Sequence, residues 1–238
     1  YGARHEALCD QGYLNNVTPA QAWMNSAEVH NTALVRTANG SAEHCGTWRG
    51  GLRFFADTPS VKGVEVAEED QAKLKQGLPA DERVLFQRTV TLLEADVGAG
   101  QVGNLSYVVD IFRLQGGAWH DYYVHSLGDQ FALTGAELKL VADPKLSLHE
   151  VSGFTYRTNT GARALTGLSR AGTDESFAAT WRELRDWRAV PPTVDREAVV
   201  QVRLLGVPGT EVFVGTALGQ RYIDARDVAQ RVTVMCVR

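Results

Sequence analysis

The sequence is short of cysteine, of excess charge and of long apolar runs, and the last two shortages narrow the possible partners. Its three cysteines, Cys9, Cys45 and Cys236, have no CxxC spacing and are odd in number, so they indicate neither a compartment nor a role. A net charge of -4 indicates no basic surface for nucleic acid. No apolar run approaches the length of a bilayer-spanning helix, so no membrane partner is expected.

Both ends of the sequence look like internal positions of a longer protein. The chain has no initiator Met and no signal peptide, so no targeting signal is visible. Its last residues, QRVTVMCVR, have a strand pattern without a following turn, and an unpaired terminal strand would expose backbone groups that need partners. We therefore expect a segment of a longer protein.

Short runs rich in Val, Thr, Tyr and Phe, separated by Gly, Asn and Pro, dominate what is present. The runs are TALVRTA, GLRFFADT, VLFQRTVTLLE, LSYVVDIFRLQ, WHDYYVHS, VVQVRLLG, EVFVGTA and RVTVMCV. Because no helices alternate regularly with them, they favour a sandwich of antiparallel sheets over βαβ units. The hydrophobic fraction of 44% is sufficient for a sizeable core.

Four segments give more specific structural predictions. RLQGGAWHDYYV predicts a hairpin, with Gly116 and Gly117 at the positive φ angles of a tight turn. SYVVDIF is apolar on both faces and predicts a strand covered on both sides. AEEDQAKLKQGL, from Ala67 to Leu78, is typical of a helix. DESFAATWRELRDWRAV fits both a helical stripe and strand alternation.

The stretch SAEVHNTALV, from Ser26 to Val35, places a histidine in a strand-like run, and ALCDQGYLNN carries Asp10 upstream of it. Carboxylate and neutral imidazole are both good ligands for zinc. A zinc site at Asp10 and His30 would require the intervening residues to fold back as a loop. The alternative is that Asp10 caps a turn and that His30 is a hydrogen-bonded interior histidine.

Two further sets of residues could have a functional or a structural role. Strand alternation places Asp121 and His125 on one face, where they could hold an ion, although cross-strand hydrogen bonding is favoured. Aromatic rings can also stack on sugars, although large aromatics of a β-sandwich are more often core residues. The tryptophans considered for stacking are Trp48, Trp119, Trp181 and Trp187.

YGARHEALCDQGY followed by TPAQAWMNSAEVHNTALV resembles the start of the β-sandwich domain in heparinase II/III-like polysaccharide lyases. The resemblance continues through GTWRGGLRFFADTPSVKGVEV, FQRTVTLLEA, LSYVVDIFRLQGGAWHDYYVHS and FVGTALGQR, so it covers nearly the whole chain. It implies an all-β fold, a large antiparallel β-sandwich of the supersandwich type over residues 1–238. This sandwich would be truncated at both ends and normally preceded by an α/α toroid, with the active site between the two.

The resemblance also implies a zinc ion held by two histidines and an aspartate. Asp10 matches the aspartate and His30 matches the histidine of the HNT motif, while the remaining histidine belongs to an upstream strand that this sequence lacks. The metal would be structural and would shape the cleft. Asn31 and Thr32 would supply hydrogen bonds around His30.

Lyases of this family cut glycans that contain uronic acids, such as glycosaminoglycans or alginate, by β-elimination. One group neutralises the sugar carboxylate, a base removes the C5 proton and an acid protonates the leaving oxygen. Most of these groups come from the toroid, so the isolated chain is expected to be inactive. Tyr13 is the candidate catalytic residue, with packing as its alternative, and Trp23 and Met24 stand where alginate-type members often have a tyrosine.

The expected partners are therefore an acidic polysaccharide and the chain's own toroid domain, in a periplasmic or secreted bacterial enzyme. The resemblance also predicts a strand over Ser176 to Arg182, followed mainly by a loop. Two alternatives remain open. One is a carbohydrate-binding or structural β-sandwich without lyase activity, and the other is a family member that has lost catalysis.

Overall fold

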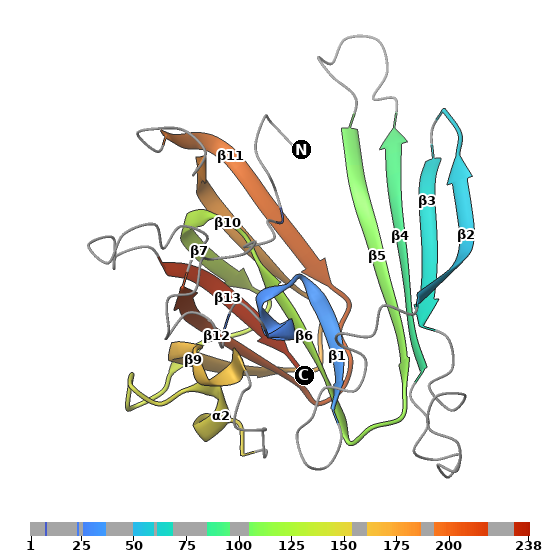
Figure 1. Cartoon of the computed structure of the whole chain (residues 1–238). Helices are drawn as coiled ribbons and strands as arrows, with labels where there is room; N and C mark the ends of the chain where they lie inside the picture. The colour runs from blue at the N-terminus through green and yellow to red at the C-terminus, as the bar shows by residue number, and fades with distance from the viewer. Residues whose placement is uncertain are drawn as a thin grey trace. The chain divides into compact units, whose positions relative to one another are not determined.

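The computed structural model shows a protein built from antiparallel β-sheets with very little helix (Figure 1). It describes residues 8, 23, 26–36, 50–59, 61–68, 85–95, 105–153, 161–186, 193–218 and 231–238. Within these residues, no helix is long and apolar enough to cross a membrane. The short helical turns are η1 (Ala27–Val29), α2 (Leu148–Val151) and η4 (Gly161–Arg163).

The strands of the described residues form three sheets (Figure 1). A six-stranded sheet has the order β1-β6-β13-β12-β9-β8, with bounds Thr32–Arg36, Trp119–His125, Arg231–Val237, Thr210–Leu218, Thr166–Thr173 and Lys139–Leu140. A three-stranded sheet has the order β11-β10-β7, with bounds Thr193–Leu204, Phe177–Asp186 and Gly128–Thr134. A four-stranded sheet has the order β2-β3-β4-β5, with bounds Gly50–Asp57, Val61–Glu68, Leu85–Ala95 and Leu105–Gln115.

The chain divides into two compact units. The first comprises residues 1–34, 39–41 and 121–238, and it contains the three-stranded sheet and most of the six-stranded sheet. The second comprises residues 35–38 and 42–120 and contains the four-stranded sheet.

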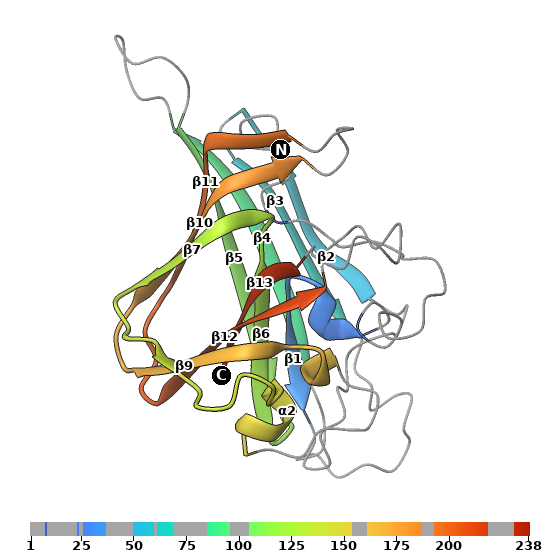
Figure 2. The ribbon, with the colours of Figure 1, turned by 90° about the vertical axis from the view of Figure 1, so that its left-hand side faces the viewer.

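A β-sandwich forms the first unit, because one buried cluster draws side chains from both of its sheets. Val212 and Met235 come from the six-stranded sheet, while Trp181 comes from the three-stranded sheet, where β7, β10 and β11 lie side by side (Figure 2). The Trp181 indole Nε1 donates a hydrogen bond to the carbonyl oxygen of Thr233 at 3.3 Å. This layering confirms the prediction of an antiparallel β-sandwich.

A second buried cluster lies on the other face of the six-stranded sheet. Phe213 of β12 belongs to this cluster, while its neighbours Val212 and Val214 belong to the first. Alternating side chains of β12 are therefore buried on both faces, as expected for a central strand. Leu148 of α2 and Ala162 of η4 complete the second cluster, so these short helical turns cover this face of the sheet.

The eight runs predicted from composition all contain strands, and the predicted strand over Ser176 to Arg182 is confirmed as β10. The loop expected to follow is wrong as far as Asp186, because β10 continues to that residue, and residues 187–192 lie outside the described part of the chain. A bulge between Arg182 and Leu184 shifts the register, after which pairing with β11 resumes at Leu184 and Asp195. Strands β3, β7, β8 and β9 are not among the predicted runs.

The predicted hairpin at Gly116 and Gly117 is wrong, although the turn itself is present. Both glycines have positive φ, 81° and 73°, but β5 and β6 belong to different sheets. A Cβ atom on Gly117 would lie 2.5 Å from a methyl carbon of Val35 and 2.7 Å from the carbonyl oxygen of Arg36. The N–H of Ala118 donates to that same oxygen at 2.6 Å. The glycines therefore allow the segment at Val35 and Arg36 to pass close to this bend. They do not lead to pairing of β5 with β6.

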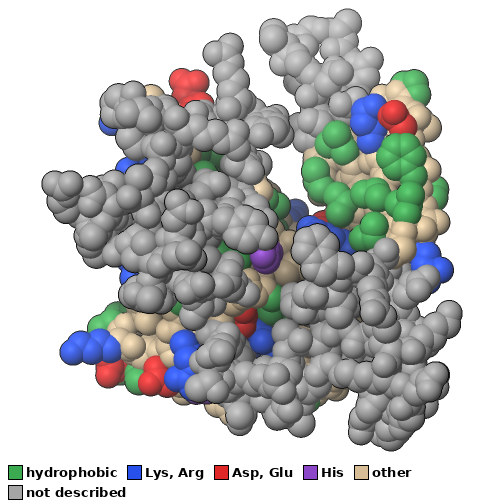
Figure 3. Space-filling view, in the orientation of Figure 1, with side chains coloured by type: hydrophobic (Ala, Val, Ile, Leu, Met, Phe, Trp, Pro, Cys, Tyr) green, Lys and Arg blue, Asp and Glu red, His purple; other side chains and the backbone are tan. Residues whose placement is uncertain are grey.

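The prediction that SYVVDIF is covered on both faces is also wrong. Tyr107 is 51% exposed and its neighbour Val108 is 58% exposed, and adjacent residues of a strand point to opposite faces. Figure 3 shows hydrophobic side chains at the surface over β2 and β3 of the same sheet. Both faces of the four-stranded sheet therefore present apolar side chains to solvent. A helix is also predicted from Ala67 to Leu78. Its first two residues belong instead to strand β3, and residues 69–78 lie outside the described part of the chain.

Candidate functional site

His30 lies directly after η1, with its imidazole exposed to solvent. Its backbone N–H donates to the carbonyl oxygen of Ala27 at 3.1 Å, and its φ and ψ of -98° and 155° place it in extended backbone. The following residues enter β1, where Leu34 and Val35 are completely buried. An exposed imidazole is the opposite of the interior histidine that was the alternative prediction. His30 can therefore meet a ligand from solvent.

The segment that leads to His30 is held by hydrogen bonds and close packing. The Ser26 hydroxyl donates to the carbonyl oxygen of Trp23 at 2.6 Å, and the Trp23 indole donates to the carbonyl oxygen of Leu218 at 3.1 Å. Gly161 of η4 packs so closely that a Cβ atom there would lie 2.1 Å from the Ser26 hydroxyl oxygen. The backbone before His30 is thus positioned by two distant parts of the chain.

His125 of β6 holds the same segment from the other side. Its Nε2 lies 2.6 Å from the carbonyl oxygen of Val29, and its backbone N–H donates to Oδ1 of Asn31 at 2.8 Å. Because a carbonyl oxygen only accepts hydrogen bonds, Nε2 of His125 carries the proton and is not available to a metal. The residues on both sides of His30 are therefore tied to one buried histidine.

The hydrogen-bonding role predicted for Asp121 and His125 is confirmed, because the two side chains have different partners. Asp121 is completely buried and accepts a hydrogen bond from Nε of Arg238 at 2.8 Å. The hydrogen bonds from Asn31 and Thr32 to His30 stay a prediction. Oδ1 of Asn31 is occupied by His125, and the Thr32 hydroxyl bonds the carbonyl oxygen of Ala33 at 3.4 Å.

The described residues supply only part of the ligand set predicted for zinc. Zinc prefers imidazole nitrogen and carboxylate oxygen in a tetrahedral set, and the exposed His30 on a fixed backbone fits one position of such a set. The other predicted ligand, Asp10, and the candidate catalytic residue, Tyr13, lie outside the described residues. Over the described part of the chain, no group of three His, Cys, Asp or Glu side chains is close enough to hold a metal.

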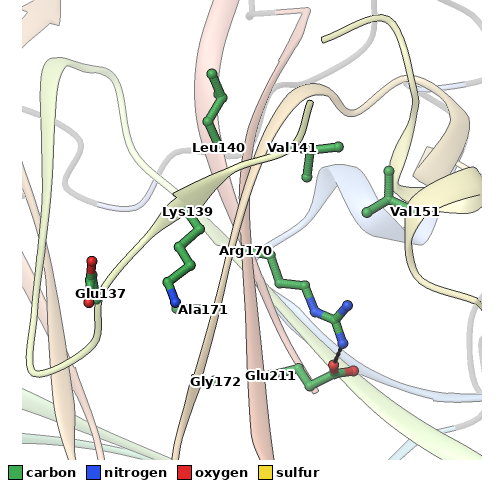
Figure 4. A pocket seen from close by; sticks show the side chains of 9 residues that line it. All are labelled: Glu137, Lys139, Leu140, Val141, Val151, Arg170, Ala171, Gly172 and Glu211. Atoms are coloured by element: carbon green, nitrogen blue, oxygen red, sulfur yellow. Dashed lines mark hydrogen bonds and ion pairs between the residues drawn. The ribbon is translucent and has the colours of Figure 1, made fainter. Parts of the chain in front are cut away.

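A separate hollow of about 560 Å³ lies at the β8 edge of the six-stranded sheet (Figure 4). Arg170 of β9 forms an ion pair with Glu211 of β12, and Lys139 of β8 lies on the neighbouring strand. The guanidinium of Arg170 also lies 5.5 Å from the centre of the Phe213 ring. The remaining lining residues are Glu137, Leu140, Val141, Val151, Ala171 and Gly172.

The described lining of this hollow is apolar and charged. It includes no Ser, Cys, His or Tyr, and one of its two carboxylates is neutralised by Arg170. His30 is not among these described lining residues. Sequence reasoning missed this hollow because β8 has only two residues and pairs with β9 from a distance of about thirty residues along the chain.

The tryptophans considered as sugar platforms do not form one in the described structure. Trp181 is completely buried, with the ring of Phe131 packed edge-on at 5.0 Å, so the core alternative is correct for it. Trp119 is half-buried, and Trp48 and Trp187 lie outside the described residues. Among the described residues, the exposed aromatic rings are Phe54, Phe55 and Tyr107, and all three belong to the four-stranded sheet.

No family model matches the sequence, and no curated protein is significantly similar to it.

Proposed function

We propose that this chain is the β-sandwich portion of a polysaccharide lyase that cleaves glycans containing uronic acids by β-elimination. The sandwich alone would not catalyse the reaction. The proposal combines the resemblance to heparinase II/III-like lyases with the antiparallel sandwich of the first unit. In this proposal, an α/α toroid preceding the chain would supply most of the reacting groups.

The observation that carries the proposal is the exposure of His30 on a backbone held from both sides. A histidine with a purely structural role is normally buried, as His125 is. The contacts of Val29 and Asn31 with His125 fix the backbone on both sides of His30, and the imidazole of His30 is exposed to solvent. Such an arrangement suits a ligand-binding imidazole whose position must not vary.

In this function, His30 and Asp10 would hold zinc, which would supply a fixed positive charge that shapes the cleft beside the toroid. The contacts of His125 would keep the backbone of His30 in place whether or not a metal is bound. Tyr13 remains the candidate in this chain for proton transfer, because a phenol can act as base or acid when its surroundings shift its pKa.

The first test measures zinc by titration calorimetry with zinc chloride on a chain extended upstream to include the histidine strand that the resemblance implies. We expect one zinc per chain, with binding weakened at least tenfold in Asp10→Ala and in His30→Ala, since each substitution removes one ligand. The control is His149→Ala, a histidine of α2 that hydrogen-bonds Arg163 and should bind zinc as the wild type does. Equal affinity in all four proteins would contradict the assignment of His30 and Asp10.

The second test measures lyase activity by the ultraviolet absorbance of unsaturated uronate products. A chain extended upstream should release these products from alginate or a glycosaminoglycan, and the 238-residue chain should not. Tyr13→Phe in the extended chain should lower kcat more than KM if the phenol transfers a proton. Absence of product from every acidic glycan with the extended chain would overturn the lyase proposal.

A further inference from the structure

The four-stranded sheet of the second unit has an exposed face on which aromatic and polar side chains lie together. Opposite residues of antiparallel strands share a face, and the registers pair Phe54 with Glu65, Glu65 with Thr89 and Thr89 with Ile111. Arg113, two residues after Ile111, is on the same face. We call this set, Phe54, Glu65, Thr89, Ile111 and Arg113, the Phe54 face.

The ring of Phe54 forms an apolar platform on this face. Its atom Cε1 lies 3.5 Å from the position that a Cβ atom of Gly63 would have, so the ring extends over β3 where a glycine leaves room for it. The residue is nevertheless 52% exposed, which leaves much of the ring accessible. Tyr107, also on this face because it pairs with Leu93 opposite Val61, is 51% exposed.

A polar triangle lies beside this platform. Nη1 of Arg113 donates to Oε2 of Glu65 at 3.2 Å and to the Thr89 hydroxyl at 3.0 Å, while that hydroxyl donates to the same Glu65 oxygen at 2.8 Å. The hydrogen bond from Thr89, with further ones from Gln87 and Arg113, lowers the pKa of Glu65 below its ordinary value. Glu65 is therefore an ionised acceptor held in one orientation.

Arg113 keeps donors available for a ligand. Its side chain is 51% exposed, and within the described part of the chain only its Nη1 makes hydrogen bonds. Nε and Nη2 form the edge of the guanidinium that binds a carboxylate in a bidentate manner. Nη1 of Arg113 reaches Glu65, and Glu65 is the cross-strand neighbour of Phe54. The Nε and Nη2 atoms of Arg113 are therefore separated from the Phe54 ring by about one or two strand spacings, each of ~5 Å.

We propose that the Phe54 face binds a chain of an acidic polysaccharide without cleaving it. The apolar face of a pyranose ring stacks on Phe54, the uronate carboxylate accepts two hydrogen bonds from Nε and Nη2 of Arg113, and Glu65 accepts a hydrogen bond from a sugar hydroxyl. Stacking and a bidentate carboxylate contact together select an acidic sugar over a neutral one. The residues of this face, and not the role of His30, carry the inference, so it holds whether or not the chain belongs to a lyase.

The test is titration of the 238-residue chain with alginate and with polygalacturonate by isothermal calorimetry, with dextran as the neutral polymer. We expect binding to the two acidic polymers, at least tenfold weaker binding to dextran, and at least a tenfold loss of acidic-polymer affinity in Phe54→Ala and in Arg113→Gln. His30→Ala should bind both polymers as the wild type does, which separates this face from the proposed metal site.

Two matched controls test the position of the site. Phe55→Ala removes a more exposed ring, at 67%, from the opposite face of the same sheet, and Arg203→Gln removes an exposed arginine from β11. Both should bind normally, and circular dichroism should give the same spectrum for all variants. The proposal is overturned if neither polymer binds, if Phe55→Ala loses as much affinity as Phe54→Ala, or if Phe54→Ala abolishes a dimer in sedimentation without changing glycan affinity.

Discussion

Asn31 and His30 are adjacent in the sequence, yet the structure assigns them opposite roles. Asn31 turns toward the protein and accepts the backbone N–H of the buried His125, while His30 turns toward solvent. Alternation along extended backbone explains this division, because neighbouring side chains point in opposite directions. A substitution at each position should therefore affect a different property of the protein.

Asn31→Ala should lower the free energy of unfolding by about 1–3 kcal/mol, because it leaves a partly buried N–H of His125 without an acceptor. His30→Ala should change the free energy of unfolding by only about 0.5 kcal/mol, since its side chain is exposed. The measurement is urea unfolding followed by tryptophan fluorescence. Asn31→Asp keeps an oxygen acceptor and should recover much of the loss. A larger loss in His30→Ala than in Asn31→Ala would contradict this division of roles.

Glu183 has an unusual backbone conformation for a residue other than glycine. Its φ of 57° is the single positive value at a non-glycine residue in the described structure, and it lies within the bulge of β10. The left-handed region costs an ordinary residue about 1–2 kcal/mol, while glycine adopts it freely. Its carboxylate accepts a hydrogen bond from Gln130 at 2.7 Å in an exposed position, where the contribution to stability is small.

Glu183→Gly should therefore raise the free energy of unfolding by about 1 kcal/mol. Chemical denaturation would show this as a transition at a higher urea concentration. Arg182→Gly is the matched control, because Arg182 has no positive φ, and glycine should destabilise β10 there by about 0.5–1 kcal/mol. A lower transition for Glu183→Gly would mean that its side-chain contacts outweigh the backbone strain.

At the scale of elements, α2 shows how a very short helix is held in place. The Glu150 carboxylate accepts hydrogen bonds from the backbone N–H of Ser147 at 2.7 Å and from its hydroxyl at 2.8 Å. These two bonds lower the pKa of Glu150 below its ordinary value of 4.5. A capping box of this kind fixes the start of the helix and thereby positions Leu148 in the core.

The lowered pKa of Glu150 predicts a dependence of stability on pH. A carboxyl group whose pKa is lower in the folded state stabilises the fold at pH values above 4.5, and this contribution disappears as the pH falls through the lower folded value. The difference in melting temperature between wild type and Glu150→Ala should therefore be constant above about pH 5 and shrink below pH 4.5. Glu150→Gln does not titrate at this position, so its difference from Glu150→Ala should not depend on pH.

At the scale of the whole molecule, the two units differ in how their sheets are covered. The sheets of the first unit bury side chains on their facing surfaces, and Trp181 lies in the centre of that core. The four-stranded sheet of the second unit has exposed apolar residues on both faces, including Phe54 and Phe55. Stability should therefore depend mainly on core residues of the first unit, while the second unit offers surface for binding.

Trp181→Ala should lower the free energy of unfolding of the first unit by about 3–5 kcal/mol, because a buried indole is removed from between two sheets. Trp181→Phe should cost less, since most of the volume remains. The measurement is calorimetric melting. Leu205→Ala, at a residue that is 83% exposed, should leave the melting temperature within about 1 °C of the wild type. Similar losses in Trp181→Ala and Leu205→Ala would show that Trp181 is not central to the core.

The sequence by itself determined the fold class and most strands, and it singled out His30 as a candidate ligand. These features depend on strand composition, turn residues and motif order, which are local properties. Only the tertiary structure decided which strands pair, and local pattern predicted a hairpin at Gly116 and Gly117 where the chain passes between two sheets. It also decided which apolar residues are covered, since burial depends on the elements that pack against a strand. For the same reason, Arg113, Glu65 and Thr89 could be brought together on the Phe54 face only by the register of three strands.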